Sequence, residues 1–182
     1  MEYMCAYKTC PHYAEPCIFS ESDMEAAISK STICPIGEDE RYFDFQRENT
    51  FFCMVVGTRT YNNYQTFCTI LDKALSSKTH QKIIIISGGA KGADSLAEKY
   101  AKEKGYHMIV FEAEWERLGN KAGPIRNEQM HKFVSTFPNR GVIAFWDGKS
   151  RGTASNFNLA KQYQNQIRIY NYTENRFMSM SA

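Results

Sequence analysis

Four segments of the chain combine glycine with basic residues, a pattern that suits phosphate binding. They are VVGTRTYNN (55–63), IIIISGGAKGAD (83–94), GNKAGPIRNEQM (119–130) and WDGKSRGTASN (146–156). Glycine has no Cβ, so a backbone N–H at such a position can approach an anion directly. Two or three charged hydrogen bonds of about 1.5–3 kcal/mol each would hold a phosphate group. The cations of these segments are Arg59, Lys91, Lys121, Arg126, Lys149 and Arg151. The alternative is a set of tight polar turns that bind nothing.

The same segments also contain carboxylates and tryptophans. Asp94, Glu114 and Asp147 are candidates for general acid or base chemistry, although Asp94 is equally placed to cap a helix or brace its own loop. Trp115 and Trp146 each offer a flat face on which a nucleobase stacks. Trp146 ends an apolar run and suits a core position, so we expect Trp115 to be the ligand contact.

Five apolar runs predict the strands that must position these residues. They span residues 51–56, 82–87, 107–112, 141–146 and 166–172. The runs are continuous, which is typical of parallel strands buried on both faces. Helical periodicity falls between them, at about 63–77, 92–104, 124–136 and 152–164. This order predicts an α/β fold with a Rossmann-like, doubly wound parallel sheet of about five strands, whose ligand crevice lies beyond the carboxyl ends of the strands.

Two familiar phosphate motifs fit poorly. The sequence GKS at 148–150 lacks the glycine that a P-loop requires five positions earlier, where Ile143 stands. SGGAKG at 87–92 is a weak match to the dinucleotide fingerprint, with Glu112 twenty residues beyond Gly92. It follows the second strand and leaves the third and fourth glycine segments without a role.

Taken together, GTR (57–59), SGGAKGAD (87–94), GPIRNEQM (123–130) and DGKSRGT (147–153) resemble the YspA-like, cpYpsA-related branch of the SLOG superfamily. Its relatives include the DNA-processing protein of natural transformation and the LONELY GUY phosphoribohydrolases. The resemblance extends from residue 51 to about 172. It implies a Rossmann-like fold that binds nucleotides, nucleotide-derived signals or, in some members, single-stranded nucleic acid.

The resemblance also implies roles for single residues. Arg126 matches an arginine that helps to hold substrate phosphate in the phosphoribohydrolases, and Gly152 and Thr153 match the GT of their PGGxGTxxE motif. The catalytic glutamate of that motif corresponds to Asn156, and an amide neither takes a proton nor stabilises an oxocarbenium-like cation. We therefore favour a binding protein over an enzyme.

Residues 1–50 differ from the rest of the chain. They contain Cys5, Cys10, Cys17 and Cys34, and only a short helix is expected, near 20–29. Four thiolates in a segment with little apolar content suit a structural zinc ion, but neither half is a CxxC knuckle, and ordinary reduced cysteines are an equal alternative. Cys53 and Cys68 lie in apolar patterns, so we expect both in the core. We expect three parts: this appendage, an α/β domain at 51–172, and a frayed tail at 173–182.

Composition limits the remaining alternatives. Of 182 residues, 43% are hydrophobic and 23% are charged, which is typical of a globular protein. The sequence shows neither a secretory signal nor an apolar run of about 20 residues, so we expect a cytoplasmic protein without membrane contact. The net charge of +2 gives no general attraction to nucleic acid, so any anion site must be local. Oligomeric state is left open, and a homo-oligomer is compatible with the sequence.

These patterns lead to three functional hypotheses. We favour a sensor or sequestering protein for a nucleotide or nucleotide-derived ligand; the alternatives are a nucleotide-processing hydrolase and a single-strand nucleic-acid binder. Apart from the structural zinc ion, which is one of two equal alternatives for the cysteines, the sequence indicates no cofactor. The expected ligand-binding residues are Gly57, Thr58, Arg59, Ser87, Gly88, Gly89, Ala90, Lys91, Gly92, Asp94, Trp115, Lys121, Arg126, Asn127, Asp147, Gly148, Ser150, Arg151, Gly152 and Thr153.

Overall fold

The computed structural model describes residues 3–4, 16–17, 50–78 and 82–178. In the amino-terminal part, β1 (Tyr3–Met4) pairs antiparallel with β2 (Pro16–Cys17). The helix expected near 20–29 and the thiols of Cys5, Cys10 and Cys34 lie outside the described residues, and only the backbone of Cys17 is described. The zinc site therefore stays a prediction.

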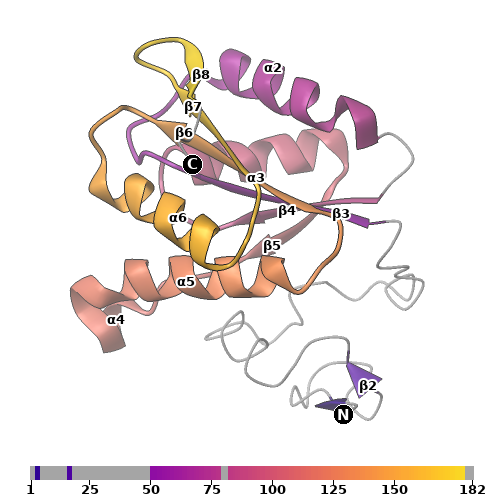
Figure 1. Ribbon diagram of the computed structural model, residues 1–182, viewed down its shortest axis with the longest axis vertical. Coiled ribbons are helices and arrows are strands. Elements are labelled where there is room, and N and C mark those ends of the chain that lie inside the picture. Colours follow the sequence, from indigo (N-terminus) through magenta and orange to yellow (C-terminus); the bar gives the residue numbers. More distant parts are fainter. Residues whose placement is uncertain (1–2, 5–15, 18–49, 79–81, 179–182) are drawn as a thin grey trace.

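A six-stranded sheet forms the centre of the molecule (Figure 1). Its strand order is β5-β4-β3-β6-β7-β8, and all neighbouring pairs are parallel except β7 with β8. The order reverses between β3 and β6, which makes this pair the topological switch point of a doubly wound sheet. The strands are β3 (Thr50–Gly57), β4 (Lys82–Ser87), β5 (His107–Val110), β6 (Arg140–Trp146), β7 (Ile167–Asn171) and β8 (Arg176–Met178).

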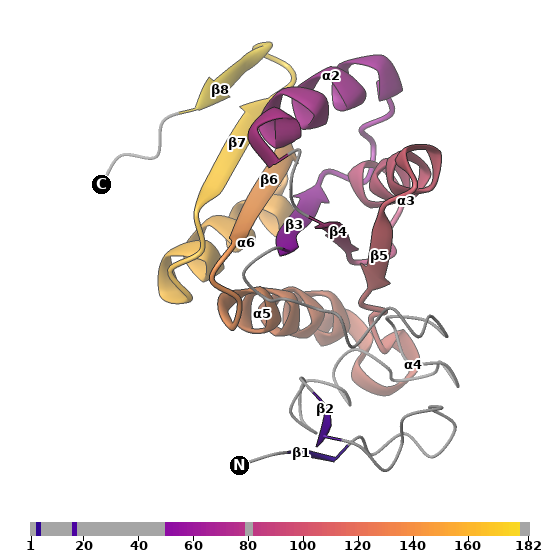
Figure 2. The ribbon, with the colours of Figure 1, turned by 90° about the vertical axis from the view of Figure 1, so that its right-hand side faces the viewer.

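Helices cover both faces of this sheet (Figures 1 and 2). One face packs against α2 (Tyr64–Leu75), which continues into the 3-10 turn η3 (Ser76–Lys78), and against α3 (Ala93–Lys104). The other face packs against α5 (Ala122–Ser135) and α6 (Arg151–Gln162). The short helix α4 (Trp115–Leu118) and the 3-10 turn η4 (Gly119–Lys121) connect β5 to α5.

The core has two halves because successive strand residues point to opposite faces. In β3, Phe52 and Met54 belong to the half beneath α5 and α6, while Cys53 and Val55 belong to the half beneath α2 and α3. All four are at most 1% exposed. This double burial explains the continuous apolar runs, and it confirms the predicted Rossmann-like α/β fold and the core position of Cys53. Cys68 on α2 is only partly buried and packs at the margin of the second half.

The carboxyl terminus differs from its prediction. Arg176–Met178, which the sequence places in a frayed tail, form β8 on the edge of β7. Asn171 accepts hydrogen bonds from the N–H groups of Thr173 and Glu174, which closes the turn, and the ring of Phe177 packs against Tyr170 at 5.5 Å. The polar residues of this segment therefore form a turn and an edge strand. No helix within the described residues is long and apolar enough to cross a membrane.

Candidate functional site

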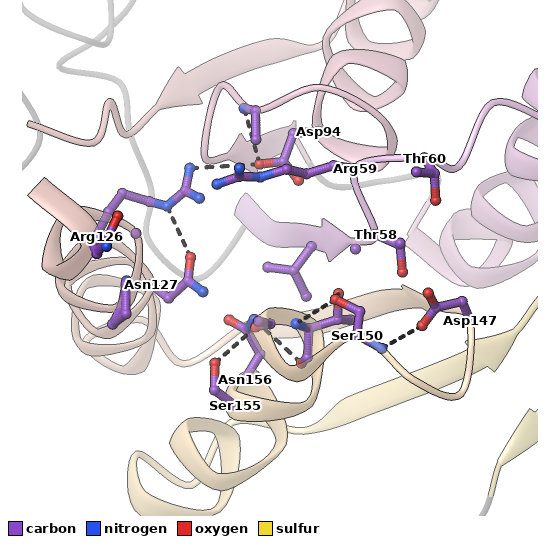
Figure 3. A pocket seen from close by; sticks show the side chains of 18 of the residues that line it. Thr58, Arg59, Thr60, Asp94, Arg126, Asn127, Asp147, Ser150, Ser155 and Asn156 are labelled. Atoms are coloured by element: carbon purple, nitrogen blue, oxygen red, sulfur yellow. Dashed lines mark hydrogen bonds and ion pairs between the residues drawn. The ribbon is translucent and has the colours of Figure 1, made fainter. Parts of the chain in front are cut away.

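A pocket of about 590 Å³ opens at the switch point, where the carboxyl ends of β3 and β6 lead into their loops (Figure 3). It is the size of a typical small-molecule site. Figure 3 places Arg59, Asp94 and Arg126 on one side, and Asp147, Ser150 and Asn156 on the other. All four glycine-containing segments contribute to its wall. Twelve of the predicted binding residues line it: Gly57, Thr58, Arg59, Ala90, Asp94, Trp115, Arg126, Asn127, Asp147, Ser150, Gly152 and Thr153.

The other eight predicted residues lie beside the pocket and do not line it: Ser87, Gly88, Gly89, Lys91, Gly92, Lys121, Gly148 and Arg151. Most of the glycine-rich segment 87–92 is in this group. The sequence pattern shows that this segment must fit a tight space, but it does not show whether a ligand or the protein itself fills that space.

Asp94 accepts hydrogen bonds from backbone N–H groups of the glycine-rich segment. Its Oδ2 accepts from the N–H groups of Gly88 and Ala90 at 3.1 and 3.3 Å, and the Ser87 hydroxyl accepts from Gly89 N–H at 3.1 Å. Asp94 is 4% exposed, and burial raises its pKa to about 6 against the opposing effects of Arg126 and the two N–H donors. Of the two sequence alternatives for Asp94, bracing the loop is the one observed.

Arg126 is also held mainly by protein oxygens. Its Nη1 donates to the carbonyl of Gly88, Nε donates to Asn127 Oδ1 at 2.9 Å, and Nη1 lies 3.7 Å from Asp94 Oδ2. The residue is 7% exposed; burial lowers its pKa, Asp94 opposes this, and nearby Arg59 lowers the pKa further. Arg126 thus fixes the glycine-rich segment to α5 and offers the pocket one edge of its guanidinium.

Gly92 serves a close contact between two loops. A Cβ at this position would lie 2.3 Å from the carbonyl oxygen of Thr58 and 2.6 Å from the carbonyl carbon of Arg59. The N–H of Ala93, in the first turn of α3, donates to Thr58 O at 3.4 Å. The amino end of α3 is therefore directed at the 58–59 backbone, which it holds in place at the pocket.

The first turn of α6 forms the opposite side of the pocket. Ser150 caps the helix and accepts from Thr153 N–H at 3.3 Å, while Asp147 Oδ1 accepts from the N–H groups of Lys149 and Ser150 at 2.9 and 2.7 Å. Although burial raises it, these backbone donors bring the pKa of Asp147 below its ordinary value. A Cβ added at Gly152 would meet nothing within 4 Å, so this turn is open to a ligand. A helix amino terminus of this kind favours an anion.

A buried polar chain supports that turn from behind. Asn165 Nδ2 donates to His131 Nδ1 at 3.2 Å, which leaves the hydrogen on Nε2 to be donated to Asn156 Oδ1 at 3.3 Å. Asn156 Nδ2 then donates to Gly152 O at 3.0 Å. His131 is fully buried, and burial lowers its pKa to about 4 despite the bond to Asn156. Position 156 is thus surrounded by one donor and carbonyl acceptors, which an amide satisfies and a carboxylate does not.

Seven further residues line the pocket that the sequence does not predict: Val56, Thr60, Asn120, Gly123, Pro124, Ser155 and Asn156. Asn120 and Asn156 each lie inside a glycine-containing segment and have an amide side chain. A pattern of glycines and cations does not distinguish such neutral polar residues from ordinary loop residues, so the sequence pattern does not identify them.

The two tryptophans differ in burial and in position relative to the pocket. Trp146 is half-buried, donates its indole N–H to Ser150 O at 3.1 Å and packs edge-on against Phe157. Trp115 lines the pocket and is 47% exposed.

Among the residues that the structure describes, no three His, Cys, Asp or Glu side chains gather as a metal site would require.

Comparison with known proteins gives two matches. Residues 53–118 match the profile of the YspA, cpYpsA-related SLOG family. The chain is 30% identical over 108 residues to the Gene 61 protein of Mycobacterium phage D29, in an alignment that covers 55% of this chain and 80% of that protein. No solved structure matches the chain significantly.

Proposed function

The chain belongs to the YspA, cpYpsA-related SLOG family, and from this membership and the geometry of the pocket we propose that it binds a nucleotide or nucleotide-derived ligand as a sensor or sequestering protein. The observation that carries the proposal is the position of the pocket. It lies at the reversal of strand order between β3 and β6, with the capped amino end of α6 and the side chain of Arg59 on its wall. Open α/β sheets bind their ligands at this place.

The polar groups of the pocket suit a phosphate next to a polar ring system. The first turn of α6 offers its uncapped backbone N–H groups, and Arg59 adds a cation from the opposite side. Asn120 and Asn127 supply amide groups to the same pocket wall that carries the exposed ring of Trp115. Asp94 and Asp147 balance part of the positive charge, so the pocket selects a shaped ligand and not simply the most negative one.

A hydrolase is the second candidate, and Asp94 is the observation that favours it. Its carboxyl group lines the pocket with a pKa of about 6, the range of a carboxylate that exchanges protons near neutral pH. Against this, Oδ2 is already engaged by two N–H groups, and position 156 is built for an amide. We therefore propose binding without turnover.

The test is calorimetric titration with the four ribonucleoside 5′-monophosphates, followed by analysis of the recovered ligand for cleavage. Gly152→Asp places a negative charge in the first turn of α6, where an acid is favourable to the helix but repels phosphate. We expect at least a tenfold loss of affinity with the fold intact. Ser95→Asp is the matched control, because Ser95 occupies the first turn of α3, is exposed and does not line the pocket.

Equal affinity of Gly152→Asp and the unmodified protein would exclude this turn as the phosphate site. Cleavage of the monophosphates that is lost in Asp94→Asn would replace the binding proposal by the hydrolase. Affinity that rises with oligonucleotide length and falls steeply with salt would instead support single-strand binding. Mass spectrometry of any small molecule that co-purifies with the protein would identify the natural ligand directly.

A further inference from the structure

Arg59 and Trp115 contact each other on the pocket wall, although they come from loops at opposite sides of β4. The guanidinium carbon of Arg59 lies 5.4 Å from the centre of the Trp115 ring, within the range of a cation–π interaction. Both side chains are exposed, and both line the pocket. The ring face that a ligand would use is therefore covered by a cation that solvent also reaches.

The backbone of Trp115 is hydrogen-bonded, and one edge of its ring packs against α5. The backbone N–H of Trp115 donates to Ala113 O at 2.9 Å, and α4 is closed by the bond from Leu118 N–H to Glu114 O at 2.9 Å. One edge of the indole lies against α5 at Gly123, where an added Cβ would be 3.2 Å from the ring atom Cη2. Glycine at this position leaves room for the indole, so one edge of the ring packs against α5 while the side chain stays 47% exposed.

Arg59 has a backbone that is held by neighbouring segments and a side chain that is exposed. Its backbone is held between the first turn of α3 at Gly92 and the bond from Thr58 N–H to Phe145 O at 2.9 Å. Within the described part of the chain, its guanidinium has no hydrogen bond or ion pair, and its contact is with the ring of Trp115. It also lies near Arg126, whose pKa it lowers. The electrostatic repulsion between two neighbouring cations is reduced when an anion binds between them.

We propose that Trp115 is the stacking platform for an aromatic base, and that the base displaces Arg59, which then turns to the phosphate of the same ligand; this rests on the proposed function and specifies its ligand class. An exposed cation–π contact contributes a factor of about 2 to 5 in an equilibrium constant, whereas base stacking contributes a factor of about 5 to 150. The exchange therefore favours the bound state. The ligand must carry both a base and a phosphate.

The test compares whole and partial ligands by calorimetry. The probes are the four ribonucleoside 5′-monophosphates, the corresponding nucleosides, and ribose 5-phosphate, which lacks the base. We expect Trp115→Ala to weaken binding of the preferred monophosphate by about 10- to 100-fold and to leave the affinity for ribose 5-phosphate within about twofold. Trp115→Phe, which keeps an aromatic face, should retain monophosphate affinity within about fivefold. Arg59→Ala should weaken the monophosphate and ribose 5-phosphate but not the nucleoside.

Indole fluorescence gives an independent readout of stacking, since Trp115 is the exposed member of the two tryptophans. Quenching by the monophosphate that persists in Trp146→Phe and disappears in Trp115→Phe supports the proposal. Binding that Trp115→Ala leaves unchanged, or a loss that is equal for the monophosphate and ribose 5-phosphate, overturns this inference alone. Failure of the unmodified protein to bind any of the four monophosphates overturns the proposed function and this inference with it.

Discussion

Gly92 and Gly105 both have positive φ angles, 81° and 67°, yet they differ in what surrounds them. An added Cβ at Gly105, which ends α3, has nothing within 4 Å, whereas one at Gly92 would overlap the backbone of Thr58 and Arg59. Comparing replacements at the two positions therefore distinguishes the energetic cost of the backbone conformation from that of a close contact between loops.

We predict that Gly92→Ala lowers the free energy of unfolding much more than Gly105→Ala. A left-handed residue such as Gly105 costs about 1 kcal/mol on replacement by alanine. Gly92 has ψ of −127°, a region almost restricted to glycine, and the overlap adds about 1 to 3 kcal/mol more. Urea denaturation of both variants gives the comparison. Equal losses would show that the 58–59 loop moves aside freely and that α3 does not hold Arg59 in place.

Residue type and spacing indicate the site but not which groups face the ligand. Arg59 and Trp115 were predictable because they stand in polar loops directly after apolar strands. Asp94 was predicted from the glycine-rich segment, and Arg126 from its own glycine-containing segment and the family resemblance, but much of their bonding is internal, to Gly88 and to each other. A buried ion pair that closes a loop and an open ligand contact require the same residue types, so only the three-dimensional structure distinguishes them.

At the scale of elements, the first turn of α6 is the part of the site whose stability is easiest to test. Ser150 caps this helix through Thr153 N–H. Its own N–H is held by Asp147. The cap therefore fixes the turn that carries Gly152 into the pocket.

We predict that Ser150→Ala lowers the free energy of unfolding by about 1 kcal/mol, the usual cost of removing a serine cap. Nucleotide affinity should fall as well, because the frayed turn no longer presents its N–H groups. Ser95→Ala is the control: its hydroxyl donates to Gly92 O at 2.9 Å and accepts from no backbone N–H of the described residues, so we expect a change below about 0.5 kcal/mol. A loss in Ser95→Ala as large as that in Ser150→Ala would mean that capping is not the cause.

The elements themselves follow closely from the sequence. Continuous apolar runs predict the five parallel strands, and helical periodicity predicts the four long helices, because both patterns reflect burial on known faces. The edge strand β8 was not predictable in this way, since it has three residues and little burial and follows a polar turn that includes Asn171 and Asn175. Its pairing depends on β7 being in place, which no local pattern records.

At the scale of the whole molecule, two buried titratable groups oppose each other in the dependence of stability on pH. Asp94 lies beneath the glycine-rich segment and faces Arg126 and Glu98, while His131 lies on α5 and faces Asn156 and Asn165. Burial raises the pKa of Asp94 to about 6 and lowers that of His131 to about 4. Between these values the folded state holds a proton on Asp94 more tightly than the unfolded state, and on His131 less tightly.

The signs follow from this difference in proton binding. As pH falls from about 6.5 to 4, His131 costs about 3 kcal/mol of stability, because the unfolded histidine binds a proton and the buried one resists it. Over nearly the same range Asp94 contributes about 3 kcal/mol in the opposite direction, because the buried carboxyl is protonated first. The two effects largely cancel. We therefore expect that removal of either group reveals the pH dependence of stability that the other group causes.

We predict that the free energy of unfolding of Asp94→Asn falls steeply relative to that of the unmodified protein as pH falls from 6.5 to 4. That of His131→Gln should rise relative to the unmodified protein over the same interval. Urea denaturation at pH 6.5, 5.5 and 4.5 gives each slope, and absolute losses from broken hydrogen bonds do not affect it. Asp72 and Asp147, whose pKa values lie below the ordinary range, add the same acid sensitivity to all three proteins and cancel in the differences. Parallel pH profiles for the variants and the unmodified protein would contradict the buried, opposed titration of Asp94 and His131.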